Sequence, residues 1–214
     1  MRLVYINPNA TVSMTEGIVA AARAACPGTE IHGVTNIDGP PAIEGPADGE
    51  RAVPGVLALV EAARADAIVI ACFDDTGLAA AQAAARCPVL GIGQSAYLMA
   101  VLLGRRFAVL TSVAAAVPVI ERNIAAMGFA GQCAGVRASG LAVLDIDAGT
   151  EPVRARLAAG ILEAQESGAQ AVVLGCAGMA PLRGDLAART GVALIDGVAA
   201  SAHLSVAAAG YLTS

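Results

Sequence analysis

The chain has 214 residues, of which 57% are hydrophobic, 14% charged and 3% aromatic, and its formal net charge at pH 7 is −5. This length fits one large domain or two small ones with cores of Ala, Val, Leu and Ile. The negative charge and the lack of a Lys/Arg cluster argue against a nucleic-acid partner. A membrane span is not expected, because no run of 18 residues is free of breakers or polar groups, and the first apolar stretch is too short for a signal peptide. We therefore expect a cytoplasmic protein.

Short apolar strands alternate with helices along the whole chain. Strands are expected at 2–6, 30–34, 67–71, 89–92, 107–110, 134–138, 171–174 and 192–195, and helices at 14–25, 53–64, 77–86, 96–103, 116–127, 152–167, 182–190 and 197–210. Residues 35–53 are expected to form a long loop, rich in Gly, Pro and Asp, whose length suggests a function. Strands that are apolar at every position are typical of parallel sheets covered on both faces, so the pattern predicts an α/β fold.

Two segments of the chain are similar to one another. The first, ADAIVIACFDDTGLAAAQAAARCPVLGI, begins at Ala65, and the second, AQAVVLGCAGMAPLRGDLAARTGVALID, begins at Ala169. Their cysteines, Cys72 and Cys176, are 176 − 72 = 104 residues apart, and Arg2 and Arg106 begin matching strands at 106 − 2 = 104. A constant offset indicates a duplicated unit. We expect two halves related by a pseudo-twofold axis, with residues 1–98 in the first, 99–196 in the second, and the terminal helix 197–214 packing back on the first.

The duplication places similar loops opposite each other. Ligands of open parallel sheets bind beyond the carboxyl ends of the strands, where Asn7, Cys72, Gln94, Thr111 and Cys176 are expected. One site between the halves is therefore predicted. Two thiols facing each other across it could act on both faces of a carbon acid, which is the chemistry of a racemase.

The other cysteines and the cofactor-binding motifs give no sign of a metal or an organic cofactor. Five cysteines without a Cys-x-x-Cys pair and two histidines give no zinc pattern, and no metal is expected. Cys26, Cys87 and Cys133 are interpreted as small buried hydrophobes. Lysine is absent, which excludes a pyridoxal phosphate aldimine. GIGQSA at 91–96 fits a dinucleotide fingerprint but lacks the acidic residue at the end of the next strand, so it is interpreted as a turn presenting Gln94 and Ser95.

Five motifs in register resemble the hydantoin/allantoin racemase branch of the aspartate/glutamate racemase superfamily. They are INPN at 6–9, GPPAIEG at 39–45, ACFDD at 71–75, GIGQSA at 91–96 and LGCAGM at 174–179. The resemblance implies two flavodoxin-like halves, a site between them, no cofactor, and two cysteines as acid and base. Cys72 and Cys176 would be this pair. A small-molecule substrate and a homo-oligomer are also expected. The residues around the substrate would be Asn7, Ile43, Phe73, Gln94, Ser95, Thr111, Ala177 and Gly178, with Asn9 acting in the turn at Pro8.

Departures from the wider superfamily indicate the substrate. Members acting on free aspartate or glutamate usually have a threonine after each cysteine, whereas Phe73 and Ala177 follow here. We therefore expect a neutral ring, a 5-substituted hydantoin or allantoin, racemised at C5. Thr76 stands where this branch is expected to have proline, which a helix start tolerates. The alternatives are an amino-acid racemase or a one-cysteine decarboxylase or isomerase of the superfamily, and, in another class, a two-lobed binding protein without chemistry.

A cysteine base needs a stabilised thiolate at neutral pH, because the free thiol titrates near ~8.5. Both cysteines precede expected helices, whose N-termini favour a negative charge. Asp74 and Asp75 oppose this at the first site, since a neighbouring carboxylate disfavours a thiolate. They could instead cap the helix with their side chains turned away. The residue pattern leaves both interpretations open.

Overall fold

The computed structural model describes residues 1–213 and contains two parallel four-stranded sheets, ordered β2-β1-β3-β4 and β6-β5-β7-β8. The strands are β1 (Arg2–Asn7), β2 (Glu30–Thr35), β3 (Ala67–Ile70), β4 (Val89–Gly91), β5 (Phe107–Thr111), β6 (Cys133–Ala138), β7 (Ala171–Gly175) and β8 (Leu194–Asp196). The helices are α1 (Val12–Ala25), α2 (Pro46–Ala62), α3 (Leu78–Ala84), α4 (Ile92–Leu102), α5 (Val117–Ala126), α6 (Val143–Ala148), α7 (Glu151–Glu166), α8 (Arg183–Thr190) and α9 (Gly197–Thr213), with short 3₁₀ turns η1 (Ala114–Ala116) and η2 (Ala177–Leu182). The predicted α/β fold of two parallel halves is confirmed.

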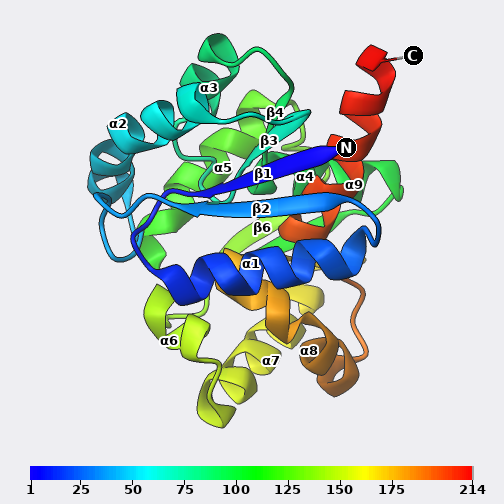
Figure 1. The fold of residues 1–214 in the computed structure, drawn as a ribbon. Helices are drawn as coiled ribbons and strands as arrows, with labels where there is room; N and C mark the ends of the chain where they lie inside the picture. The colour runs from blue at the N-terminus through cyan, green and yellow to red at the C-terminus, as the bar shows by residue number, and fades with distance from the viewer. Residues whose placement is uncertain (214) are drawn as a thin grey trace.

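The strand register repeats between the two halves. Leu3 pairs with Ala67 where β1 meets β3, and Phe107 pairs with Ala171 where β5 meets β7. Both partners are shifted by the same amount, since 107 − 3 = 104 and 171 − 67 = 104. Figure 1 shows the first sheet with α2 and α3 above α1, and α6, α7 and α8 below it. The offset in the sequence therefore corresponds to a repeat of structure.

Alternate residues of β1 face two different hydrophobic clusters. Leu3 and Tyr5 belong to a large cluster that also contains Phe107 of the second half. Val4 and Ile6 belong to a smaller cluster with residues of α2, α3 and β3. The sheet is thus covered on both faces, which explains why its strands are apolar at consecutive positions. The larger cluster joins the halves and holds the strand ends of both in fixed positions.

The terminal helix α9 packs against α1 and β3 and also against α4. The hydroxyl of Tyr5 in β1 lies 3.2 Å from the carbonyl oxygen of Val198 and donates to it. The predicted boundary between residues 98 and 99 falls inside α4, and the division into two domains stays a prediction. Position 214 of the predicted terminal helix lies outside the described residues.

Three elements differ from the sequence-based expectation. Helix α2 begins at Pro46 rather than at 53, because Pro46 takes a first-turn position that needs no N–H donor. The predicted loop 35–53 is correspondingly shorter. Helix α4 begins at Ile92, directly after β4, rather than at 96. The six-residue helix α6 was not predicted, and it ends at Gly149, which has a left-handed backbone.

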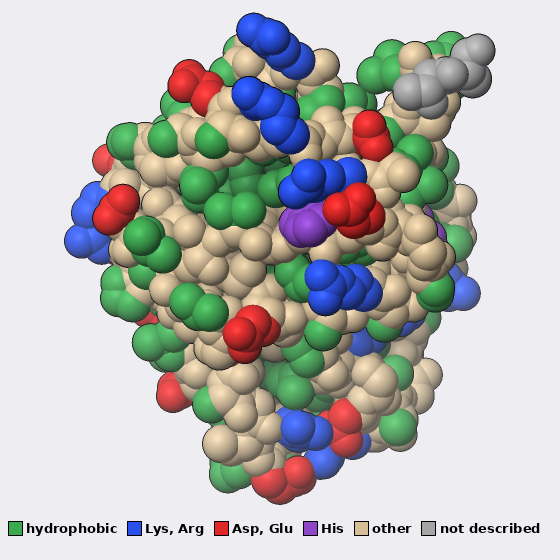
Figure 2. Space-filling view, viewed as in Figure 1, with side chains coloured by type: hydrophobic (Ala, Val, Ile, Leu, Met, Phe, Trp, Pro, Cys, Tyr) green, Lys and Arg blue, Asp and Glu red, His purple; other side chains and the backbone are tan. Residues whose placement is uncertain are grey.

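The surface carries charges of both signs. Figure 2 shows Arg and Asp/Glu side chains interspersed on the visible face. On β2 and the neighbouring strand, Glu30 lies 2.6 Å from His32 and 3.9 Å from Arg2. Within residues 1–213, none of the helices is both long enough and apolar enough to cross a bilayer.

Candidate active site

A pocket lies between the halves at the carboxyl ends of β1, β3, β5 and β7. Both cysteines of the repeat line it. The full lining consists of Asn9, Met14, Ile43, Ala71, Cys72, Phe73, Asp74, Thr111, Ser112, Ala116, Val143, Gly175, Cys176 and Ala177. Parallel strands end at the same edge of their sheet, so the two sheets present their carboxyl ends to one shared space. The pocket is therefore built from residues of both halves.

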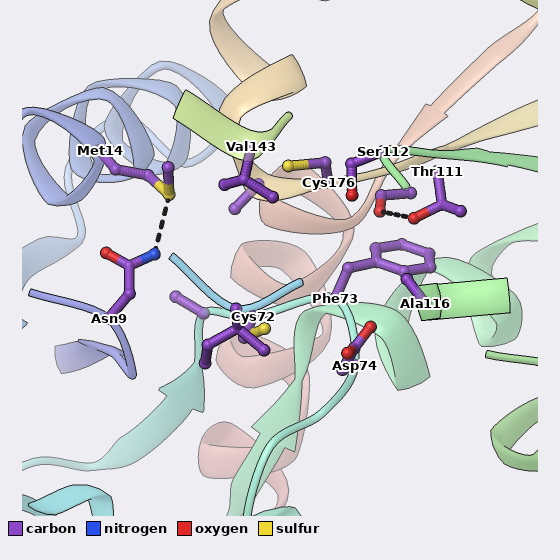
Figure 3. A pocket seen from close by; sticks show the side chains of 14 residues that line it. Asn9, Met14, Cys72, Phe73, Asp74, Thr111, Ser112, Ala116, Val143 and Cys176 are labelled. Atoms are coloured by element: carbon purple, nitrogen blue, oxygen red, sulfur yellow. Dashed lines mark hydrogen bonds between the residues drawn. The ribbon is translucent and has the colours of Figure 1, made fainter. Parts of the chain in front are cut away.

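The two cysteines are held by equivalent turns. The N–H of Asp75 donates to the carbonyl oxygen of Cys72 over 3.0 Å, and the N–H of Met179 donates to that of Cys176 over the same 3.0 Å. In Figure 3 the two sulfurs lie on opposite sides of the pocket. The structural repeat therefore places the Cys72 thiol on one wall of the pocket and the Cys176 thiol on the other.

Burial dominates the ionisation of both thiols. It raises the pKa of Cys72 far above its usual range, and the nearby charge of Asp74 raises it further. Burial also raises the pKa of Cys176 to about 12, although the N–H of Gly178 lowers it in part. Cys72 lies six residues before the start of α3 at Leu78, whereas Cys176 is the N-cap of the 3₁₀ turn η2, to which Gly178 belongs. The donors that lower the thiol pKa are the Thr76 hydroxyl and the Asp74 N–H at Cys72, and the Gly178 N–H at Cys176.

The two aspartates after Cys72 have different positions. Asp74 lines the pocket, and burial raises its pKa to about 6 against the opposing charge of Arg122. Asp75 is turned toward α4, where it accepts hydrogen bonds from the N–H groups of Gly93 and Gln94. Asp75 therefore caps a helix, but this helix is α4 and not α3, the helix after Cys72, which has no side-chain cap. The other interpretation, a carboxyl close to the thiols, applies to Asp74.

Four of the predicted substrate-binding residues line the pocket beside the cysteines: Ile43, Phe73, Thr111 and Ala177. The ring of Phe73 packs edge-on against Tyr97 of α4, with 5.6 Å between ring centroids. The hydroxyl of Thr111 donates to the carbonyl oxygen of Gly175 over 2.9 Å, which ties the ends of β5 and β7 together. These contacts fix two sides of the pocket.

The other four predicted substrate-binding residues do not line this pocket in the part of the chain that the structure describes. They are Asn7, Gln94, Ser95 and Gly178. The amide of Asn7 donates to the side chains of Asn9 and Thr15 behind the pocket. The side chain of Gln94 accepts from the N–H of Gly91, and Ser95 is fully buried within α4. An added Cβ at Gly178 would touch Ile146 of α6. A role in substrate binding stays a prediction for Asn7, Gln94, Ser95 and Gly178.

Several lining residues were missed from the sequence. Asn9 was assigned to the turn at Pro8, and its side-chain oxygen does accept from the N–H of Thr11 over 2.9 Å. Its amide nitrogen nevertheless reaches the Met14 sulfur at 3.2 Å along the pocket wall (Figure 3). Ser112 follows directly on Thr111, and this adjacency is the signal that could have identified it. Met14, Ala116 and Val143 have no signal in a single sequence, since tertiary packing alone brings them here.

Two hydrogen bonds connect the halves at the edge of the pocket. The carboxylate of Glu44, next to Ile43, accepts from the N–H of Val143 at the start of α6 over 2.7 Å. The hydroxyl of Ser13 in α1 donates to the carboxylate of Asp147 over 2.7 Å. The Glu44 side chain therefore has a fixed partner in the second half. The loop that carries Ile43 is thereby joined to the second half.

The chemistry of the lining is largely apolar, with a few polar groups. Thiols, hydroxyls, one amide and the carboxyl of Asp74 face the pocket, and its lining includes no Lys, Arg or His. Within residues 1–213 no group of three or more His, Cys, Asp or Glu side chains is placed to hold a metal ion. Such a lining suits an uncharged molecule that offers hydrogen-bond donors and acceptors.

Comparison with known proteins agrees with this arrangement. A family model described as Asp/Glu/Hydantoin racemase matches residues 3–204. A hydantoin racemase of Rhizobium meliloti is 43% identical over 223 aligned positions, covering 100% of this chain and 92% of the relative. The structure of an allantoin racemase from Klebsiella pneumoniae superposes with a TM-score of 0.92 at 38% identity, covering 98% of this chain and 89% of the other. An allantoin racemase structure from Pseudomonas fluorescens gives 0.91 at 34% identity, covering 97% and 90%.

The family model spans nearly the whole chain, and the matched relatives are covered over most of their own length. The resemblance in the five sequence motifs is thus confirmed. With two parallel sheets, a pocket between their carboxyl ends and a cysteine on each wall, the chain belongs to the Asp/Glu/hydantoin racemase family, whose racemases are isomerases.

Proposed function

We propose that this chain is a cofactor-independent racemase of 5-substituted hydantoins or allantoin, with Cys72 and Cys176 as the acid and base. The observation that carries the proposal is the pair of thiols at equivalent strand ends, on opposite walls of one pocket. A binding protein has no need of two matched thiols, whereas a racemase needs a proton acceptor and a proton donor on opposite faces of one carbon.

The reaction begins with one cysteine as thiolate and the other as thiol. The thiolate removes the C5 proton of the ring, and the electron pair of the C–H bond passes into the adjacent carbonyl as an enolate. The opposite thiol then gives its proton to C5 on the other face, becomes the thiolate, and leaves the first cysteine protonated. The two cysteines exchange states at each turnover. The backbone N–H groups of Asp74 and Gly178 favour the thiolate forms of Cys72 and Cys176 respectively.

The composition of the lining supports a neutral ring over an amino acid. An aspartate or glutamate substrate would bring two carboxylates close to Asp74, in a pocket whose lining offers no cationic side chain. Phe73 and Ala177 also replace the hydroxyls that hold a free carboxylate in the wider superfamily. A hydantoin or allantoin ring carries N–H groups, from which the Asp74 carboxyl can accept, and carbonyl oxygens, to which the Asn9 amide nitrogen can donate.

The experiment is proton exchange with solvent, followed by NMR in heavy water. Enantiopure allantoin, 5-alkyl and 5-benzyl hydantoins are incubated with the protein, and the C5 proton signal and the enantiomer ratio are measured together. We expect loss of the C5 signal and approach to a racemic mixture. L-Aspartate, L-glutamate and an arylmalonate serve as competing substrates. Turnover of one of these without any change in the rings would replace the proposal by one of its superfamily alternatives.

The class of relatives agrees with a small-molecule substrate. A homo-oligomeric state and a cytoplasmic location stay predictions from the sequence. Binding of a ring without exchange of its C5 proton would favour the non-catalytic alternative.

A further inference from the structure

The loop that carries Cys72 contains an unfavourable backbone conformation. Asp75 has φ 53, and it is the single non-glycine residue with positive φ among those the structure describes. Left-handed backbone is disfavoured for side chains with a Cβ, and Asp and Asn tolerate it better than most. Such a conformation persists only where surrounding contacts hold it. The question is which contacts hold Asp75.

The contacts are made by its carboxylate with the N-terminus of α4. The N–H of Gly93 donates to Oδ1 over 2.9 Å, and the N–H of Gln94 donates to Oδ2 over 2.7 Å. Gly91, the N-cap residue, has no side chain to satisfy these donors. An added Cβ at Gly91 would collide with the Asp75 carboxylate, and one at Gly93 would collide with the carbonyl oxygen of Phe73. The glycines leave the space that the Cys72 loop fills.

The second half caps its equivalent helix differently. There Asp196, the residue before α9, accepts from the N–H of Val198 over 2.9 Å and of Ala199 over 3.1 Å. Asp196 takes the place of Gly91, because Gly91 pairs with Ile70 in the first sheet and Asp196 pairs with Leu174, 174 − 70 = 104 residues later, in the second. Met179 matches Asp75, since 179 − 75 = 104. Both helices thus have a two-bond carboxylate cap. In the second half the capping carboxyl belongs to Asp196, the residue directly before the helix, whereas in the first half it belongs to Asp75 in the Cys72 loop.

We propose that Asp75 is a positioning residue that fixes Cys72 on its wall of the pocket, and that Cys176 does not depend on it. The turn explains how the effect is transmitted, because the N–H of Asp75 donates to the carbonyl oxygen of Cys72 over 3.0 Å. Anchoring one end of this turn to α4 anchors the cysteine at the other end. The inference rests on the proposed function for its effect on catalysis, and on geometry alone for its effect on the Cys72 thiol.

The first test compares Asp75→Gly with Asp196→Gly. Asp75→Gly keeps the left-handed backbone accessible and removes the carboxylate, while Asp196→Gly removes the matched cap without touching the Cys72 loop. Alkylation of each thiol by iodoacetamide is followed by peptide mass spectrometry. We expect Asp75→Gly to accelerate alkylation of Cys72 by about tenfold and to leave Cys176 unchanged, because access controls the reaction of a buried thiol. Asp196→Gly should leave both rates unchanged. Equal effects of the two substitutions on Cys72 would overturn the proposal.

The second test separates positioning from helix capping. The double variant Asp75→Gly with Gly91→Asp returns a carboxylate cap to α4 from its own N-cap, into space that the first substitution vacates. The thermal stability of the protein should recover in this double variant. Alkylation of Cys72 should stay fast, and the racemisation rate should stay about 100-fold below wild type, because displacement of a catalytic group by 1 Å can lower the rate by that factor. Asp75→Asn retains an acceptor and tolerates the backbone, so it should recover part of the activity. If the double variant recovered both the wild-type racemisation rate and the slow alkylation of Cys72, Asp75 would act only as a helix cap, and the proposal would be wrong.

The two proposals fail in different ways. If Cys72→Ser racemises hydantoins at the wild-type rate, the two-thiol mechanism is wrong. The alkylation rates still decide whether Asp75 positions Cys72, because that measurement needs no turnover.

Discussion

The carboxyl of Asp74 in the pocket should make the stability of the protein depend on pH, and Asp74→Asn should remove that dependence. Burial raises the pKa of Asp74 from 3.8 to about 6. Between these values the folded protein holds a proton that the unfolded chain has released. The free energy of unfolding therefore falls as pH rises through this window. The contribution of the protonated carboxyl is fully present below pH 4 and is lost above pH 6.

The magnitude follows from the size of the shift. The pKa differs by 6 − 3.8, roughly two units, and each unit corresponds to about 1.4 kcal/mol between the two protonation states. Wild type should therefore lose on the order of 3 kcal/mol as pH rises from 4 to 7, a loss that Asp74→Asn does not show. Asp75, whose pKa burial raises to about 8, contributes the same sign of dependence to both proteins. Burial is the largest cause of the Asp75 shift and the charge of Asp74 the smallest, so most of the Asp75 contribution is common to wild type and variant.

Urea unfolding at intervals from pH 4 to pH 7.5 measures the difference directly. A second readout is alkylation of the thiols against pH, because the charge of Asp74 raises the pKa of both Cys72 and Cys176. Asp74→Asn should shift both alkylation profiles to lower pH. A difference in unfolding free energy between wild type and variant that stays constant over the whole range would refute the reasoning.

Two further outcomes are expected. Exhaustive dialysis and chelation should leave racemisation intact while thiol alkylation abolishes it, and activity that a chelator removes and a metal restores would contradict the proposed mechanism. Gly175→Ala should destabilise the protein by about 2 kcal/mol, because a Cβ there would lie 2.8 Å from the carbonyl oxygen of Leu110 and 3.0 Å from the Cα of Thr111. Gly184→Ala is the matched control in α8, with no atom within 4 Å of its Cβ, and should stabilise by about 0.5 kcal/mol in the same thermal unfolding measurement.

The repeat made most of the fold predictable. A constant offset of 104 residues located both cysteine loops, and apolar strands indicated sheets covered on both faces. The failures were local. The start of α2 was expected at Val53, whereas Val53 and Pro54 lie inside the helix. The real start at Pro46 lies in a stretch whose Gly, Pro and Asp content is typical of loops.

The pocket was predictable where its residues adjoin the strand ends and unpredictable where packing decides. Cys72 and Thr111 follow apolar strands, so the strand pattern places them at the site, whereas Phe73 and Ala177 were assigned to it through the resemblance to the family. Val143 reaches the pocket through α6, which the Glu44 carboxylate holds from 99 positions away in the chain. Asn7 and Asn9 are two residues apart, and only the direction of each side chain decides which one lines the wall.

The central claim is that Cys72 and Cys176 serve opposite faces of one carbon. Its most direct test is exchange of the C5 proton of each enantiomer of 5-benzylhydantoin in heavy water, with Cys72→Ser and Cys176→Ser measured side by side. Both variants should stop racemising, and each should retain exchange for one enantiomer only, the opposite one in the two variants. Racemisation by either variant at the wild-type rate would contradict the claim and favour an enzyme that uses a single cysteine.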